Sequence, residues 1–126
     1  MRNISFSATI EQLKNGTKNV TRRVWKKQWV NRGDILCAVE KAQGLRKGEK
    51  IKRLEKIMVL EVSQEPLRRI IDEPNRSYHP LPPRREVSRE GFPALTEEQF
   101  CEMFCRLNKK CTLDTIVTRI AFVKVE

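Results

Sequence analysis

The sequence predicts an α+β domain built around a curved sheet or a small β-barrel, with helices packed at its ends. Two observations carry this prediction. Short apolar runs rich in β-branched residues alternate with short amphipathic segments, and the chain has only 126 residues, 39% of them hydrophobic. That length suits one core and not two, so residues 1–126 are expected to form a single domain.

The chain opens with a predicted strand at residues 4–6 and a short helix at residues 9–15. Ile10 and Leu13 lie one helical turn apart, and Gly16 permits the left-handed backbone that commonly ends a helix.

Two tryptophans follow, four positions apart. A helical turn would place Trp25 and Trp29 on one side and the intervening Lys26 and Lys27 on another. Because tryptophan is also a common core residue, we expect Trp29 to pack inward.

Three further strands are expected at residues 35–39, 57–62 and 116–123, where branched apolar residues concentrate. The first should be covered on both faces, and the last should be a central strand. Residues 41–56 are highly charged and contain two glycines, which predicts an exposed hairpin or loop.

Prolines punctuate the second half of the chain. Pro66 suits the first turn of a short helix over residues 67–71. Residues 72–89 then form a predicted inserted loop rich in proline and arginine, which we interpret as a lid over a cleft.

A capping box predicts the start of the longest helix. The Thr96 hydroxyl and the Gln99 amide can bind the free backbone groups there, and the helix should run to about Asn108. Its core face is expected to consist of four side chains at helical spacing: Phe100, Met103, Phe104 and Leu107.

Positive charge is confined to one half of the chain. Residues 1–56 hold 15 lysines and arginines against 5 acidic residues, whereas residues 57–126 hold 11 of each. Such a field predicts an anionic partner, with RNA or DNA phosphates first and a nucleotide or an acidic membrane surface after them. The alternative is a merely solvated surface.

The longest apolar run, Ile35 to Val39, has five residues, far below the roughly 20 that span a bilayer. The N-terminal residues lack the apolar stretch of a secretion signal, so we expect a cytoplasmic protein whose four cysteines are thiols. The spacing of Cys37, Cys101, Cys105, Cys111 and the single His79 matches no standard zinc signature. We therefore expect no metal site and a core role for Cys101 and Cys105.

Chemistry is expected in the segment Gly16-Thr17-Lys18-Asn19-Val20-Thr21-Arg22-Arg23. In a continuous strand Lys18 and Thr21 would point to opposite faces, so a shared site requires a turn or bulge between them.

This segment resembles the signature of the ASCH domain family. Three further motifs occur in the family's order and extend the resemblance over nearly the whole chain: Gly33-Asp34, Glu90-Gly91-Phe92 and Val117-Thr118-Arg119-Ile120-Ala121-Phe122. The chain is similar to the small stand-alone members of bacteria and their phages. The resemblance implies a β-barrel related to the PUA domain, a fold that often handles RNA, with the signature segment lining a cleft.

Some small ASCH proteins are amidohydrolases that remove acyl groups from N4 of cytidine without a cofactor. The resemblance places their catalytic lysine, threonine and glutamate at Lys18, Thr21 and Glu90. A lysine can activate a threonine only if its pKa is lowered, which burial and the charges of Arg22, Arg23 and Lys14 would do. An ionised Glu90 touching Lys18 would oppose this change.

Binding of RNA, a nucleoside or a nucleotide without chemistry is the first expectation, and hydrolysis is the alternative. A third is a structural ion pair between Lys18 and Glu90. Expected contacts to nucleic acid, through stacking or phosphates, are Arg22, Arg23, Trp25, Lys26, Lys27, Arg32 and Tyr78.

Overall fold

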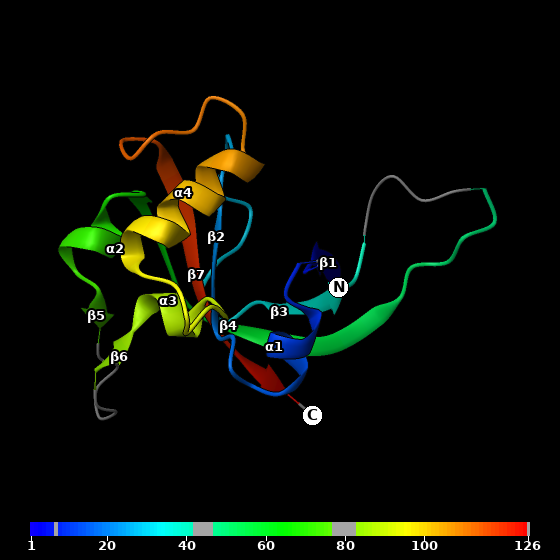
Figure 1. Ribbon diagram of the computed structural model, residues 1–126. Helices are drawn as coiled ribbons and strands as arrows, with labels where there is room; N and C mark the ends of the chain where they lie inside the picture. The colour runs from blue at the N-terminus through cyan, green and yellow to red at the C-terminus, as the bar shows by residue number, and fades with distance from the viewer. Residues whose placement is uncertain (7, 42–46, 77–82, 126) are drawn as a thin grey trace.

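The structure, a computed structural model, describes residues 1–6, 8–41, 47–76 and 83–125. One sheet contains strands β1 (Arg2–Ser5), β2 (Val20–Arg23), β3 (Ile35–Val39), β4 (Arg53–Pro66) and β7 (Ile116–Val125). The helices are α1 (Ile10–Lys14), α2 (Arg69–Asp72), α3 (Glu86–Arg89) and α4 (Glu97–Leu107). A two-stranded ribbon pairs β5 (Asn75–Arg76) with β6 (Arg84–Arg85) (Figure 1).

The main sheet is mixed and curled, with strand order β1-β3-β4-β7-β2. β1 and β3 are parallel, whereas β3, β4, β7 and β2 pair antiparallel in turn. The register between β4 and β7 shifts between Val59 and Glu61, and such a bulge bends a strand. The predicted α+β class and curved sheet are confirmed. Among the described strands the sheet is a half-barrel whose edges are β1 and β2, and not a closed barrel.

Two hydrophobic clusters flank the sheet, and the candidate site lies between them. One surrounds α1 and the first strands, with Ile4, Phe6, Leu13, Leu36, Ile120 and Phe122 among its members. The other lies beneath α2, α3 and α4, which gather together in Figure 1 while α1 lies apart, and it includes Leu67, Ile70, Val87, Phe100, Phe104 and Val117.

Elements with strong local signals were predicted correctly. β3 has the predicted bounds, and β7 lies between β4 and β2 as a central strand. The capping box of α4 is present: Thr96 Oγ1 accepts from the Gln99 N–H at 3.1 Å, and Gln99 Oε1 accepts from the Thr96 N–H at 2.9 Å.

Three predictions of local structure were wrong. Pro66 is the last residue of β4 and does not lie in the first turn of a helix, since α2 begins only at Arg69. β4 begins at Arg53, so the exposed connection is shorter than 41–56. Trp25 and Trp29 flank a bend at residues 26–27 and do not lie in a helical turn, although their ring centroids are 4.8 Å apart.

The predicted core face of α4 was correct for Phe100 and Phe104, which are buried, and for the partly buried Met103. It was wrong for Leu107, which is 70% exposed because the last turn of α4 extends past the second cluster. Ile35 is also exposed, so β3 is not covered along its full length. Within the described ranges, no helix is long and apolar enough to cross a membrane.

Candidate functional site

The segment before β2 holds Lys18 between two helices. Gly16 has φ +82° and turns the chain after α1. The Lys18 N–H donates to Gln12 O at 3.0 Å, and the Asn19 N–H donates to Arg89 O at 2.8 Å. Lys18 thus lies outside the strand that carries Thr21, as a shared site requires.

Glu90 lies at the end of α3 and contacts the Lys18 side chain through two of its atoms. Lys18 Nζ donates to the main-chain oxygen of Glu90 at 2.7 Å and to its Oε1 at 3.2 Å. The next residue, Gly91, has φ +105°, and a Cβ there would lie 3.1 Å from Gln12 Cβ and 3.6 Å from Lys18 Cβ. Glycine suits this position because its backbone adopts the positive φ and because a Cβ would crowd the Gln12 side chain.

Arg22 occupies the other oxygen of Glu90. Its Nη1 donates to Glu90 Oε2 at 2.8 Å and its Nη2 donates to Glu86 Oε1 at 2.7 Å. The guanidinium is fully buried. We expected Arg22 to contact nucleic acid phosphates, but the structure makes it an internal ion-pair partner, so the expectation is corrected.

Thr21 and Arg23 share one face of β2, because side chains alternate along a strand. Thr21 is buried, and its Oγ1 accepts from Arg23 Nε at 3.1 Å. Arg23 Nη2 also donates to Ser5 O at 2.6 Å, and the guanidinium lies 5.0 Å from the centre of the Phe6 ring. Arg23 therefore holds the Thr21 hydroxyl against β1.

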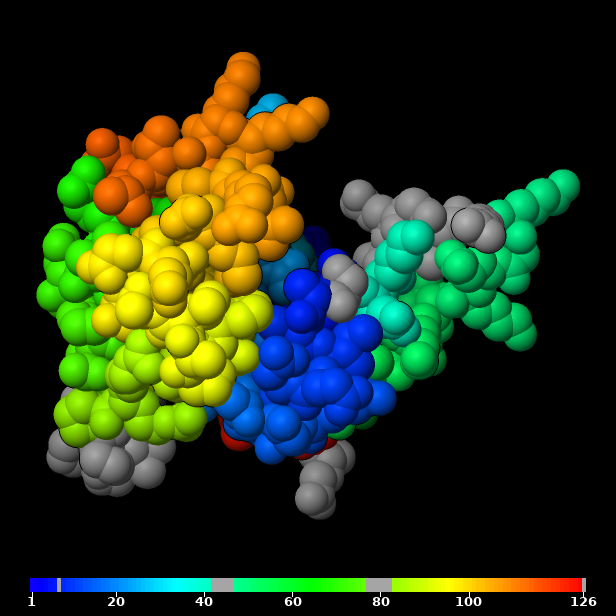
Figure 2. All heavy atoms as spheres, in the orientation of Figure 1, coloured from blue at the N-terminus to red at the C-terminus, as the bar shows by residue number. Residues whose placement is uncertain are grey.

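Lys18, Thr21 and Glu90 line one open cavity of about 440 Å³. Figure 2 shows the surface hollowed between α4, yellow to orange, and the blue N-terminal segment. Polar and apolar groups share the walls about equally, and the apolar side chains come from the loops and α4: Phe6, Trp25, Phe92, Phe100, Met103, Phe104 and Leu107. The structure thus brings together all three residues that the ASCH resemblance selects.

Burial is the largest influence on Lys18 and lowers its pKa from 10.5. The positive charges of Arg23 and Arg22 act in the same direction, whereas Glu90 raises the pKa by its charge and its hydrogen bond. The net change is downward. Lys14, which we also expected to contribute, is exposed.

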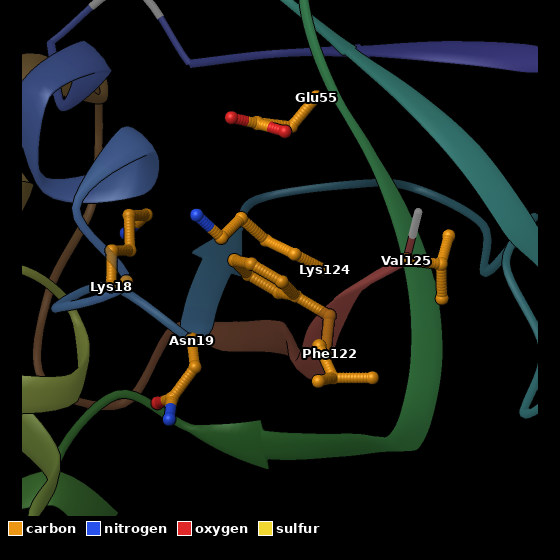
Figure 3. A pocket seen from close by; sticks show the side chains of 8 residues that line it. Lys18, Asn19, Glu55, Phe122, Lys124 and Val125 are labelled. Atoms are coloured by element: carbon orange, nitrogen blue, oxygen red, sulfur yellow. The ribbon is translucent and has the colours of Figure 1, made fainter.

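A second cavity, of about 540 Å³, lies on another side of the Lys18 segment (Figure 3). Glu55 and Lys124 lie on opposite sides of it in the figure, and Lys124 Nζ donates to Lys14 O at 2.7 Å. Although this cavity is larger, neither Thr21 nor Glu90 lines it. The smaller cavity is therefore the better candidate site.

A buried network of ion pairs, which was not predicted from the sequence, is connected to the site through Arg22. Glu86 accepts from Arg22 and from Arg119 Nε, each at 2.7 Å, and from Arg89 Nη1 at 3.3 Å. Hydrogen bonds and charges of Arg119 and Arg22 lower the Glu86 pKa from 4.5 to about 2, despite burial. The available signal was Arg119, an arginine within the apolar run of β7.

The other predicted nucleic-acid contacts are dispersed. Lys26, Lys27 and Arg32 are exposed, and Trp25 lines the cavity. Trp29 packs against the first core cluster, as expected. Tyr78 lies outside the described residues, as does His79.

The structure describes residues 72–76 and 83–89 of the inserted loop, and none of them lines the cavity. This part of the loop therefore does not form the predicted lid. The loop instead supplies Glu86 to the buried network. In the described ranges, no group of three or more histidine, cysteine or acidic residues is arranged to hold a metal ion.

Comparison with known proteins informs the fold. No model of a protein family matches the sequence, and no curated protein matches it significantly. The structure is similar to the crystal structure of protein EF3133 from Enterococcus faecalis V583, described under the family model DUF984, with a TM-score of 0.58 and 14% identity. The similarity covers 99% of this chain and 76% of that chain. At this identity it supports the α+β architecture and carries no statement about activity.

Proposed function

We propose that the protein is an ASCH-type, PUA-like domain that binds a nucleoside or nucleotide unit of RNA in the cavity lined by Lys18, Thr21 and Glu90. One observation carries the proposal. Lys18 and Glu90 contact each other and, together with Thr21 from a separate segment, line an open cavity that also has aromatic and aliphatic side chains in its walls. Small-molecule sites typically combine apolar walls with a few convergent polar groups.

Each polar group keeps capacity for a ligand. Two of the three Lys18 ammonium protons are donated to Glu90, which leaves one for an acceptor on a base or sugar. The Thr21 oxygen accepts from Arg23, and its own proton remains to be donated. Glu90 has a further lone pair on each oxygen for an exocyclic amine, and the Trp25 indole offers a face on which a base can stack.

Longer RNA would also reach exposed cations outside the cavity. Lys26 and Lys27 follow Trp25 directly, and Arg32 lies before β3. These three side chains, and not Arg22, are available for phosphates. Binding through them should weaken with salt, whereas binding of an uncharged nucleoside should not.

Hydrolysis of N4-acylated cytidine is the second candidate, favoured by the lowered pKa of Lys18. A neutral Lys18 would take the Thr21 proton as Oγ1 attacks the acyl carbonyl. Collapse of the tetrahedral intermediate would break the C–N bond, with the proton passing from Lys18 to the departing amine. Water would then hydrolyse the threonine ester. Arg23, a cationic donor on Oγ1, favours the developing alkoxide, whereas the contact with Glu90 favours the ammonium and opposes the first step.

The test measures cytidine and N4-acetylcytidine with the parent protein and with Lys18→Ala, Thr21→Ala and Glu90→Gln, after circular dichroism has verified folding. Calorimetry reports binding, and chromatography reports acetate release. Lys14→Ala is the matched control, because Lys14 is a nearby exposed lysine outside this cavity.

Saturable binding that the three variants lose and the control keeps would support the pocket. Acetate release that requires all three residues would favour the hydrolase. If the folded parent neither binds nor turns over these nucleosides, and an RNA oligonucleotide does not bind either, the proposal is overturned.

A further inference from the structure

Two thiols face each other where α4 gives way to β7. Cys105 Sγ lies 3.0 Å from Cys111 Sγ, and both residues are half-buried. A disulfide bond joins sulfur atoms at about 2.05 Å, so a displacement of roughly 1 Å would bring the pair to bonding distance.

The turn between the two cysteines holds them in this position. Asn108 Nδ2 donates to Phe104 O at 2.8 Å, and the Cys111 N–H donates to Asn108 O at 3.2 Å. Lys110 has φ +61°, in the left-handed region, which folds the chain back on the last turn of α4. The approach of the sulfur atoms is thus a consequence of the helix end.

We propose that Cys105 and Cys111 are a redox-sensitive pair that a peroxide converts reversibly to a disulfide. The Cys111 thiolate attacks a peroxide oxygen, breaks the O–O bond and becomes a sulfenic acid, releasing one water once the leaving hydroxide is protonated. The Cys105 sulfur then attacks the Cys111 sulfur, the S–S bond forms, and a second water leaves with the Cys105 proton. Two thiols lose two electrons, and one hydrogen peroxide becomes two waters.

The surroundings assign the two roles. Cys105 Sγ donates to Cys111 Sγ, an arrangement that favours negative charge on Cys111 and makes Cys105 the resolving residue. Burial, together with the hydrogen bond and charge of Cys111, also raises the pKa of Cys105. Cys101, one turn earlier on α4, is buried, and burial raises its pKa to about 11. It is therefore a bystander and a matched control for the cysteine substitutions.

The disulfide would act on the rim of the candidate cavity. The loop that it closes contains Leu107 and Asn108, and both line the cavity next to Phe104. Oxidation would therefore tie the end of α4, at this rim, to Cys111 in the segment that leads to β7. The proposal concerns the thiol pair itself and stands independently of the proposed ligand.

The test treats the folded, reduced protein with a small molar excess of hydrogen peroxide, blocks the remaining thiols and counts them. The parent protein, with four cysteines, should retain two free thiols, and dithiothreitol should restore the others. Cys101→Ser should also lose two thiols, whereas Cys105→Ser and Cys111→Ser should form no internal disulfide. Closing so short a loop should raise Tm by about 5 °C.

Peptide mapping identifies the bond. Trypsin releases residues 90–106, which contain Cys101 and Cys105, and residues 111–119, which contain Cys111. These two peptides should be linked in oxidised Cys101→Ser protein. The proposal is overturned if peroxide leaves all the parent thiols free, or if the link is absent from oxidised Cys101→Ser protein. Because the parent and Cys101→Ser decide the result, misfolding of the other two variants would not obscure it.

Discussion

Lys18 Nζ lies 2.7 Å from the main-chain oxygen of Glu90 and 3.2 Å from its carboxylate, although the residues are 72 positions apart. A buried amine is thereby held by two acceptors. Burial removes water and favours the neutral amine, whereas the carboxylate favours the ammonium. The balance between these effects decides whether Lys18 can act as a base or serves as a fixed cation for a ligand.

Lys18 should titrate below the exposed lysines, because burial is the larger effect. NMR of the lysine ε-carbons would follow the titration, and Lys18→Met would identify the resonance. Because the folded-state pKa is lowered, the unfolded chain binds more protons between that pKa and 10.5. The free energy of unfolding should therefore contain a component that rises with pH through this window and is missing in Lys18→Met.

Glu90→Gln tests how the Glu90 carboxylate affects the Lys18 pKa. Removing the carboxylate charge should lower the Lys18 pKa further, since that charge raises it in the parent protein. A Lys18 that titrates together with the surface lysines in the folded parent would contradict this account of the site.

Glu86 should make the fold sensitive to acid. Its folded-state pKa of about 2 lies below the ordinary 4.5, so its contribution to stability is fully present above pH 4.5 and is lost as pH falls toward 2. The expected loss is about 3 kcal/mol. Urea unfolding at several pH values would measure it.

Glu86→Gln is the comparison. The amide cannot balance Arg22, Arg89 and Arg119 as the carboxylate does, so the variant should be less stable by about 3 kcal/mol at pH 7. The difference in the free energy of unfolding between parent and variant should shrink toward pH 2. A difference that stays constant with pH would refute the assigned role of Glu86.

Local signals explain what the sequence predicted well. The capping box of Thr96 and Gln99 and the dense branched residues of β3 and β7 act over a few neighbouring positions, so their elements follow from pattern alone. The grouping of Lys18 with Glu90 came from the ASCH resemblance. No spacing rule connects two residues that far apart.

Side-chain partners explain what the sequence could not predict. Arg22 and Arg23 are adjacent and chemically alike, yet alternation along β2 directs Arg22 into a buried network and Arg23 toward Thr21. The exposure of Leu107 likewise depends on where the second core ends, which the helical pattern does not contain. These outcomes depend on tertiary packing.

Gly91→Ala should disturb the site as well as the fold. The new Cβ would lie 3.1 Å from Gln12 Cβ at a φ of +105°, so either Gln12 or the turn that carries Glu90 must shift. We expect a loss of about 2–4 kcal/mol in the free energy of unfolding, from backbone strain and crowding together.

Gly48→Ala separates these two causes. Gly48 also has a positive φ, +83°, but a Cβ there would meet no atom within 4 Å. Gly48→Ala should lower the free energy of unfolding by about 1 kcal/mol through backbone strain alone. Equal losses of stability in the two variants would show that the close approach to Gln12 has no energetic consequence.

Trp25 should report a base in the cavity, if the proposed function is right. In Trp29→Phe the remaining tryptophan lines the cavity, so cytidine should quench its fluorescence. In Trp25→Phe the remaining Trp29 packs against the core beside Arg2, whose guanidinium lies 5.3 Å from its ring, and cytidine should leave its emission nearly unchanged. Trp25→Ala should weaken cytidine binding by about 1–3 kcal/mol through lost stacking. Because the two rings are only 4.8 Å apart, quenching of Trp29 alone would place the base on the opposite side of the pair, outside the cavity of Lys18 and Thr21.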